Sequence, residues 1–222
     1  MSEVMVSEGI IESYWLLKDY WTRVRFAYQT ENGGWSDIDV VAYDPETRHL
    51  VIAESKVRGP KKAIYAYTEA TQKKYGSLLD YDGNNYFSFL ENLPRICRDG
   101  VLFKNFSRMV EKLTVQLVSN YVIDQDMNEK AKATVLKRIN HLLPKMQCEI
   151  DVMLDSTMAI MVQVIELENE MTKGRRYGNA MLDIAREINR YAHPDIKYAG
   201  RGDKDKLKAQ MISPLIDALK GY

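Results

Sequence analysis

A chain of 222 residues with 45% hydrophobic and 28% charged residues is long enough for one sizeable hydrophobic core and has the composition of an ordinary globular protein. Lysine plus arginine and aspartate plus glutamate number 31 each, so overall basicity gives no argument for a nucleic-acid partner, which would need local basic patches. The two cysteines lack a metal-binding spacing and suit a cytoplasmic protein, and we expect neither a signal peptide nor a membrane-spanning helix.

The first part of the chain predicts a helix followed by three strands. Residues 7–21 carry apolar side chains at helical spacing, and residues 23–30 alternate apolar and polar side chains as a strand does. Two further strands are expected at about 37–43 and 49–57. The turn residues 44–47 between them form a connection short enough for an antiparallel hairpin.

The middle of the chain is predicted to be mostly helical. A helix is expected over about 61–79, and the Gly- and Asn-rich residues 81–86 predict a loop with at least one short helix after it. A strand follows at 113–123, and a helix at 128–143 ends before Pro144.

The last part is open to two interpretations. Residues 148–167 predict two strands around Asp155 and Ser156, but a buried helix over 158–168 fits as well. Helices are expected at 175–192 and 205–220. Because no repeat or low-complexity linker interrupts the chain, we expect one domain of the α/β or α+β class with a partly antiparallel sheet.

The predicted hairpin carries charged residues where strand residues normally pack. Glu54 and Lys56 continue the strand face that begins with Leu50. If Tyr43 pairs with Leu50, Asp39 lies directly opposite Glu54, whereas a slip of one residue would place the two carboxylates on different faces. Asp39 can therefore share a site with Glu54 only if the two strands pair in this register.

Two facing carboxylates repel each other, and a divalent cation removes the conflict. Mg²⁺, for which Mn²⁺ commonly substitutes, prefers oxygen ligands such as Asp39, Glu54 and the backbone carbonyl of Ser55. Lys56 beside them would activate water or stabilise phosphorane charge, and this set of groups suits phosphodiester hydrolysis. Asp37 competes with Asp39 as a ligand, and the alternative for the whole cluster is a surface ion-pair group at a hairpin end.

This arrangement resembles the PD-(D/E)XK nuclease superfamily. The matching residues are Asp39 within SDIDVVAYDP and the run Glu54-Ser55-Lys56, although Ile38 stands where the family often has proline. The predicted order helix, three strands, helix, strand also looks like the family core, over about residues 7–120. The resemblance implies a restriction-endonuclease-like mixed sheet flanked by helices, elaborated by C-terminal strands and helices over about 121–222.

The resemblance also implies roles for further residues. Glu12, on the first predicted helix, matches a glutamate that relatives often place there, and it would act as an outer ligand or water-orienting group; a solvent-facing residue is the alternative. Gln72 matches a polar position near the site of some relatives, or is a surface glutamine. Basic residues around the site and on the helix after it would bind phosphate, unless they form a solvated helix face; they include Arg58, Lys61, Lys62 and Lys73.

These expectations together describe a Mg²⁺-dependent deoxyribonuclease, acting as an endonuclease. DNA as the substrate comes from the resemblance alone, and RNA is the alternative that the same chemistry would serve. Many relatives cut both strands as dimers, so a homodimer is one arrangement that the resemblance allows, and the sequence leaves the oligomeric state open. The rival function is a catalytically inactive nucleic-acid-binding or assembly subunit that keeps the fold.

Overall fold

The computed structural model describes residues 5–57, 80–97, 102, 110–120, 125–170, 178–192 and 217. The strands in these ranges are β1 (Trp21–Gln29), β2 (Trp35–Asp44), β3 (His49–Lys56), β4 (Lys112–Ser119) and β5 (Glu149–Ser156). The helices are α1 (Val6–Leu17), α3 (Asp80–Cys97), α5 (Gln125–Leu142), α6 (Thr157–Glu170) and α7 (Ala180–Ala192).

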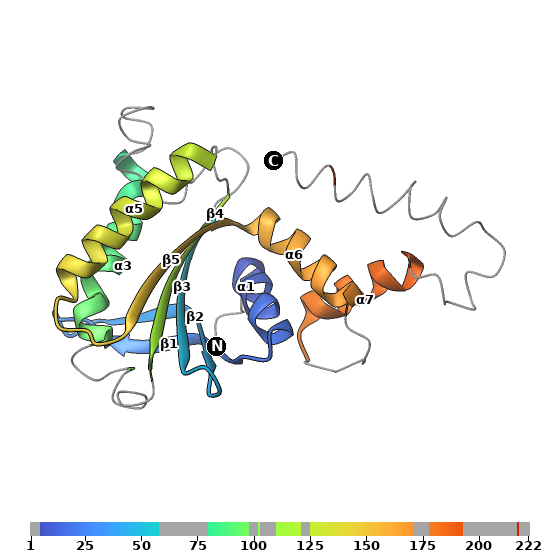
Figure 1. The fold of residues 1–222 in the computed structure, drawn as a ribbon, viewed down its shortest axis with the longest axis horizontal. Helices are drawn as coiled ribbons and strands as arrows, with labels where there is room; N and C mark the ends of the chain where they lie inside the picture. Colours follow the sequence, from blue (N-terminus) through green and yellow to red (C-terminus); the bar gives the residue numbers. More distant parts are fainter. Residues whose placement is uncertain are drawn as a thin grey trace.

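The five strands form one mixed sheet in the order β1-β2-β3-β4-β5. β1, β2 and β3 pair antiparallel, whereas β3, β4 and β5 pair parallel. Helices α3 and α5, which lie between the parallel strands in sequence, cover one face of the sheet, and α1, α6 and α7 lie on the other (Figure 1). The predicted α/β class, with a mixed sheet flanked by helices, is therefore confirmed.

Each face of the sheet has its own hydrophobic core. We call them the α3–α5 core and the α1–α6–α7 core. Strand residues of the α3–α5 core include Val41, Tyr43, Leu50, Ile52, Leu113, Val115, Leu117, Val152 and Leu154. Strand residues of the α1–α6–α7 core include Val40, Ala42, Val51, Ala53 and Val118. Neighbouring residues of β2 and β3 thus alternate between the cores, as the period of a strand requires.

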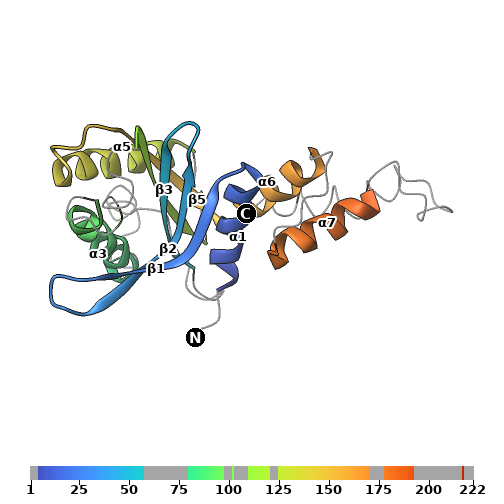
Figure 2. The same cartoon turned by 90° about the horizontal axis from the view of Figure 1, so that it is seen from below.

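The hairpin of β1 and β2 reaches beyond the rest of the sheet and passes close to α3 (Figure 2). Arg95 on α3 donates a hydrogen bond from Nε to the carbonyl of Gln29 at the end of β1. On the opposite side of the turn, Trp35 begins β2 with 76% of its surface exposed. The strand that carries Asp39 therefore starts on an exposed projection and runs into the centre of the sheet.

The first helix is shorter than the predicted range 7–21. It ends at Leu17, and Trp21 begins β1 with 71% exposure instead of packing on the helix face. Asp19 adopts a left-handed backbone with a φ of 66°, a conformation that ends helices. Trp21 shares the helical spacing of the apolar residues before it without being part of the helix.

Residues 81–86 are helical, so the loop predicted there is wrong. They belong to α3, which continues through Pro94 to Cys97. The prediction followed the local preference of Gly83 and its asparagine neighbours for turns. The second half of α3 packs into the α3–α5 core through residues such as Leu90 and Leu93, and such packing outweighs weak local preferences.

The segment with two interpretations contains one strand and one helix. β5 ends at Ser156 and α6 begins at Thr157, so the predicted second strand is wrong and the helical alternative is confirmed. Ser156 Oγ accepts a hydrogen bond from the backbone N–H of Ala159 at 3.1 Å, which caps the helix. The β-branched residues of α6 favoured a strand locally, but the helix buries Ile160, Val164 and neighbouring residues in the α1–α6–α7 core.

The remaining elements follow the sequence more closely. The strand predicted at 113–123 and the helix predicted at 128–143 correspond to β4 and α5, and the described part of 175–192 contains α7. The helix predicted at 205–220 lies outside the described residues, apart from Asp217. No described helix is both long and apolar enough to cross a membrane.

Asn179 fastens α7 to α1. Its Oδ1 accepts hydrogen bonds from the backbone N–H groups of Met181 and Leu182 at 2.9 and 3.3 Å, which caps α7. Its Nδ2 donates to the carbonyl of Gly9 at 3.3 Å and to Glu12 Oε2 at 2.8 Å. One buried amide therefore satisfies polar groups on both helices.

Replacing this amide should destabilise the fold in two steps. Asn179→Ser keeps a capping hydroxyl but loses the donors to α1, and Asn179→Ala loses the cap as well, which costs about 1 kcal/mol more. The free energy of unfolding in urea should therefore decrease from wild type to the serine variant and again to the alanine variant. An alanine variant as stable as wild type would show that the hydrogen bonds of Asn179 do not stabilise the fold.

Candidate functional site

The register of β2 and β3 brings the predicted carboxylates together. Tyr43 pairs with Leu50, as the sequence analysis required, and the described pairs end at Val40 and Ala53. Continued one step further, the same register would set Asp39 opposite Glu54. The register that a shared site requires is therefore present. Both carboxylates lie at the end of the hairpin away from the turn.

Asp39 lies where the regular pattern of β2 breaks. Ile38 packs in the α3–α5 core, whereas Val40 packs in the opposite core, although residues two apart on a strand normally share a face. The Asp39 carboxylate accepts a hydrogen bond at Oδ2 from the backbone N–H of Ser55 at 2.6 Å. A side chain of β2 thus binds a backbone group of β3 just beyond their last described pair.

Glu54 is almost fully buried, with one oxygen paired and one not. The residue is 6% exposed. Its Oε1 contacts Lys56 Nζ in an ion pair, and 26% of the lysine side chain is exposed. Its Oε2 is buried and has no hydrogen-bond partner among the residues that the structure describes. The hydroxyl of Ser55 is also buried without a described partner.

Burial raises the pKa of both carboxyl groups. Desolvation and, after it, the charge of Asp39 raise the pKa of Glu54 to about 8, while Lys56 opposes the shift. Desolvation also raises the pKa of Asp39 to about 6, against the hydrogen bond from Ser55 and the charge of Lys56. The two groups cannot both ionise readily near neutral pH unless a cation joins them.

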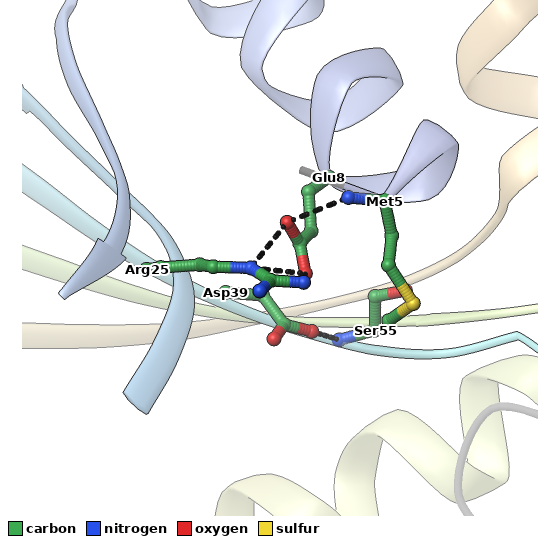
Figure 3. Close-up of polar contacts among 5 residues, drawn as sticks. All are labelled: Met5, Glu8, Arg25, Asp39 and Ser55. Atoms are coloured by element: carbon green, nitrogen blue, oxygen red, sulfur yellow. Dashed lines mark hydrogen bonds and ion pairs between the residues drawn. The ribbon is translucent and has the colours of Figure 1, made fainter. Parts of the chain in front are cut away.

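A third carboxylate, Glu8, lies on the same side of the site as Asp39, with Arg25 between them (Figure 3). Its negative charge raises the pKa of Asp39, after the larger effects of burial and its other neighbours. Glu8 is 1% exposed and is held by Arg25, whose Nε lies 3.2 Å from Oε1 and 3.0 Å from Oε2 and whose Nη2 lies 3.1 Å from Oε1. The backbone N–H of Met5 donates to Oε2 at 3.0 Å. Both oxygens of Glu8 are therefore hydrogen bonded.

Glu12 has a different position. Its Oε1 accepts a hydrogen bond from Thr22 Oγ1 at 3.1 Å, and its Oε2 accepts the one from Asn179. These contacts join α1 to β1 and α7, which gives Glu12 a role in stability. Its catalytic role stays a prediction, and the first-helix carboxylate whose charge acts on Asp39 is Glu8.

The sequence analysis did not find Glu8 or Arg25 as site residues. Glu8 is an acidic residue in the first turn of α1, which is a common stabilising position and by itself indicates no site. A glutamate four residues before Glu12 shares its helix face, and this spacing was the available signal. Arg25 carried no signal, because it occupies an ordinary polar position in an alternating strand.

The donor set fits a small divalent cation. Asp39 and Glu54 offer carboxylate oxygens, one of them buried without a described partner, and the Ser55 carbonyl is adjacent in sequence. Such oxygen ligands suit Mg²⁺ or Mn²⁺. In the part of the chain that the structure describes, no cluster of three or more His, Cys, Asp or Glu side chains is arranged to hold an ion. The fit therefore rests on two carboxylates, a number that Mg²⁺ sites commonly use.

The predicted substrate-binding residues cannot be placed. Arg58, Lys61, Lys62, Gln72 and Lys73, together with the predicted helix at 61–79, lie outside the described ranges. Their proposed contacts with phosphate remain predictions.

Comparisons with known proteins assign no family. No family model and no curated protein matches the chain. A crystal structure of a protein of unknown function, AF1548, is similar to it over 97% of this chain and 98% of that one, with 11% sequence identity and a TM-score of 0.32. This similarity is too low to support an argument about fold or function.

The raised pKa values of Glu54 and Asp39 predict that the metal-free protein loses stability as pH rises. Between the ordinary pKa of 4.5 and the folded value of about 8, Glu54 binds more protons in the folded than in the unfolded state, so ionisation favours unfolding. Asp39 adds the same effect between 3.8 and about 6. The free energy of unfolding in EDTA should decrease across this window.

Glu54→Gln, measured in the same buffers, serves as the control for this pH dependence. The amide cannot ionise, so the decrease between pH 6 and about 8 should be smaller in the variant. Equal slopes for the variant and wild type would contradict the assignment of the raised pKa to Glu54.

Proposed function

We propose that the chain is a divalent-metal-dependent nuclease of restriction-endonuclease-like fold that hydrolyses phosphodiester bonds in DNA. The observation that carries this proposal is the meeting of Asp39 and Glu54 at the end of the β2–β3 hairpin, with Lys56 against Glu54. A buried carboxylate oxygen without a described partner, next to a second carboxylate, is a costly arrangement that a cation would stabilise.

The order of elements supports the proposed fold. Within the described ranges, α1, β1, β2, β3, α3 and β4 follow the sequence helix, three strands, helix, strand that the resemblance implies. The candidate residues lie on β2 and β3 of this set, at the carboxyl end of β3. In α/β sheets with parallel strands, that end is where ligands commonly bind.

Each proposed site residue has a distinct task. Asp39 and Glu54 would hold the ion, which when bound would polarise the phosphodiester and lower the pKa of water at the site. The Ser55 N–H fixes the orientation of the Asp39 carboxylate through its hydrogen bond. Lys56 is partly exposed and positively charged, so its ammonium can reach the substrate phosphate and stabilise negative charge that develops on it.

Trp35 supports a nucleic acid as the substrate. It lies four residues before Asp39 on the same strand and is 76% exposed. An exposed indole offers a stacking surface for a base that has left its helix. Proteins that bind single-stranded nucleic acids use exposed aromatic side chains of this kind as stacking surfaces.

The direct test is cleavage by purified protein. Linear, circular and branched DNA and single-stranded RNA are incubated with Mg²⁺, Mn²⁺, Zn²⁺ or EDTA. We expect cleavage of DNA with Mg²⁺ or Mn²⁺ and none with EDTA. Cleavage of RNA alone would change the substrate, and binding without cleavage under every condition would favour the inactive nucleic-acid-binding subunit.

Substitution of Lys56 should separate chemistry from binding. Lys56→Ala removes the cation but keeps both carboxylates, so the cleavage rate should fall at least about 100-fold while the variant still binds Mn²⁺. Asp39→Ala should lose Mn²⁺ binding and cleavage together. Calorimetry and single-turnover cleavage measure the two quantities.

Lys112→Ala is the matched control for this experiment. Lys112 is also a strand lysine paired with an acidic residue, Glu149 at 3.3 Å, but it begins β4 beside His49, at the other end of the sheet. Its variant should cleave as fast as wild type. A Lys56→Ala variant that also cleaves at the wild-type rate would refute the proposed role of the lysine.

A further inference from the structure

Arg25 has a strained backbone in the middle of a strand. Among the described non-glycine residues, Asp19, Arg25 and Arg48 have positive φ values, of 66°, 53° and 54°. Asp19 follows α1, and Arg48 lies in the turn before β3, where such conformations are expected. Arg25 lies inside β1, where a left-handed residue is less stable than one in the ordinary strand conformation. Strain of this kind persists where surrounding contacts require it.

The strain lies beside Asp39. The described pairs of β1 and β2 include Val24 with Val40 and Phe26 with Ile38, so the same register sets Arg25 opposite Asp39. This is also the point at which the alternation of β2 is interrupted. Both strands therefore depart from regular geometry at one position, and the departure directs the Arg25 side chain towards α1.

There the guanidinium meets the buried carboxylate of Glu8. Three of its contacts with the two oxygens are between 3.0 and 3.2 Å, which is the two-pronged arrangement that arginine forms with a carboxylate. The pair raises the pKa of the guanidinium, chiefly through the hydrogen bonds to Glu8, so Arg25 stays charged. Both oxygens of Glu8 are thus hydrogen bonded, whereas Glu54 pairs one oxygen with Lys56 and has a second, buried oxygen without a described partner.

We propose that Arg25 is a positioning residue that engages Glu8 in place of a metal ion and so limits the site to one divalent ion on Asp39 and Glu54. This inference rests on the proposed metal site. Arg25 and Glu8 form a neutral unit that fixes the beginning of α1 against β1 beside Asp39. Removing either partner leaves an unpaired charge next to the ion, and removing both restores neutrality.

The test is a double-variant cycle read by Mn²⁺ binding. Affinity and stoichiometry are measured by calorimetry and by electron paramagnetic resonance of free Mn²⁺. Wild type should bind one ion. Arg25→Asn leaves the negative charge of Glu8 without its arginine and should raise the Mn²⁺ affinity about tenfold. Glu8→Gln leaves the positive charge of Arg25 without its carboxylate and should lower the Mn²⁺ affinity about tenfold. The double variant should return to within about twofold of wild type.

The variants are chosen so that the fold survives. Asparagine tolerates a positive φ better than most residues, and Arg25→Gly is the second choice because glycine adopts it without strain. Arg48→Asn is the matched control, since Arg48 has nearly the same φ and an ion pair with Glu111 at 2.6 Å, but lies at the turn end of the hairpin. It makes the same change in charge and should leave Mn²⁺ affinity unaltered.

Three results would contradict the inference, and a fourth would contradict the metal site on which it rests. If the double variant binds as weakly as Glu8→Gln, Glu8 is a metal ligand and the inference is wrong. If melting temperatures change but no affinity does, the pair is only structural and the inference is also wrong. Two ions bound by wild type, with the second lost in Glu8→Gln, would overturn it as well. Wild type that binds no Mn²⁺ would overturn the metal site itself, together with everything that rests on it.

Discussion

The hydrogen bond from the Ser55 N–H to Asp39 is the interaction on which the site depends. It lies where the described pairing of β2 and β3 has ended, so a side chain holds the two strands together at the point where their backbones stop pairing. This places the Asp39 carboxylate between the strands and opposite Glu54. The burial of both groups, and hence their raised pKa values, follows from that position in the sheet.

The hairpin was predictable because several independent patterns agreed. The period of two along both strands, the turn residues between them and the single register that aligns the carboxylates all indicated the same pairing. The predictions that failed, a loop over 81–86 and a second strand after Ser156, fall on helices in which tertiary packing outweighs local preference. The Gly- and Asn-containing start of α3 and the β-branched α6 are helical, and both helices contribute residues to a core that no local pattern describes.

Only the part of the candidate site that lies within one hairpin could be predicted from the sequence. Asp39, Glu54 and Lys56 lie on one hairpin, and their relation follows from strand geometry. Glu8 and Arg25 reach the site from α1 and from the middle of β1, and their contact depends on how a helix sits on a sheet and on one strained residue. Glu8 and Glu12 share a helix face, and spacing can predict that face but not which of its turns meets a given strand.

The mixed topology of the sheet has a consequence for how the site forms during folding. The β2–β3 hairpin closes a short loop, and such local contacts form quickly, whereas β4 and β5 join through long crossovers that are slow to close. Asp39 and Glu54 can therefore meet while still hydrated, when their repulsion is weak. Glu54 lies opposite Leu117 of β4, so its burial is completed when β4 docks against β3, and this later step acts against the charge that the hairpin brings together.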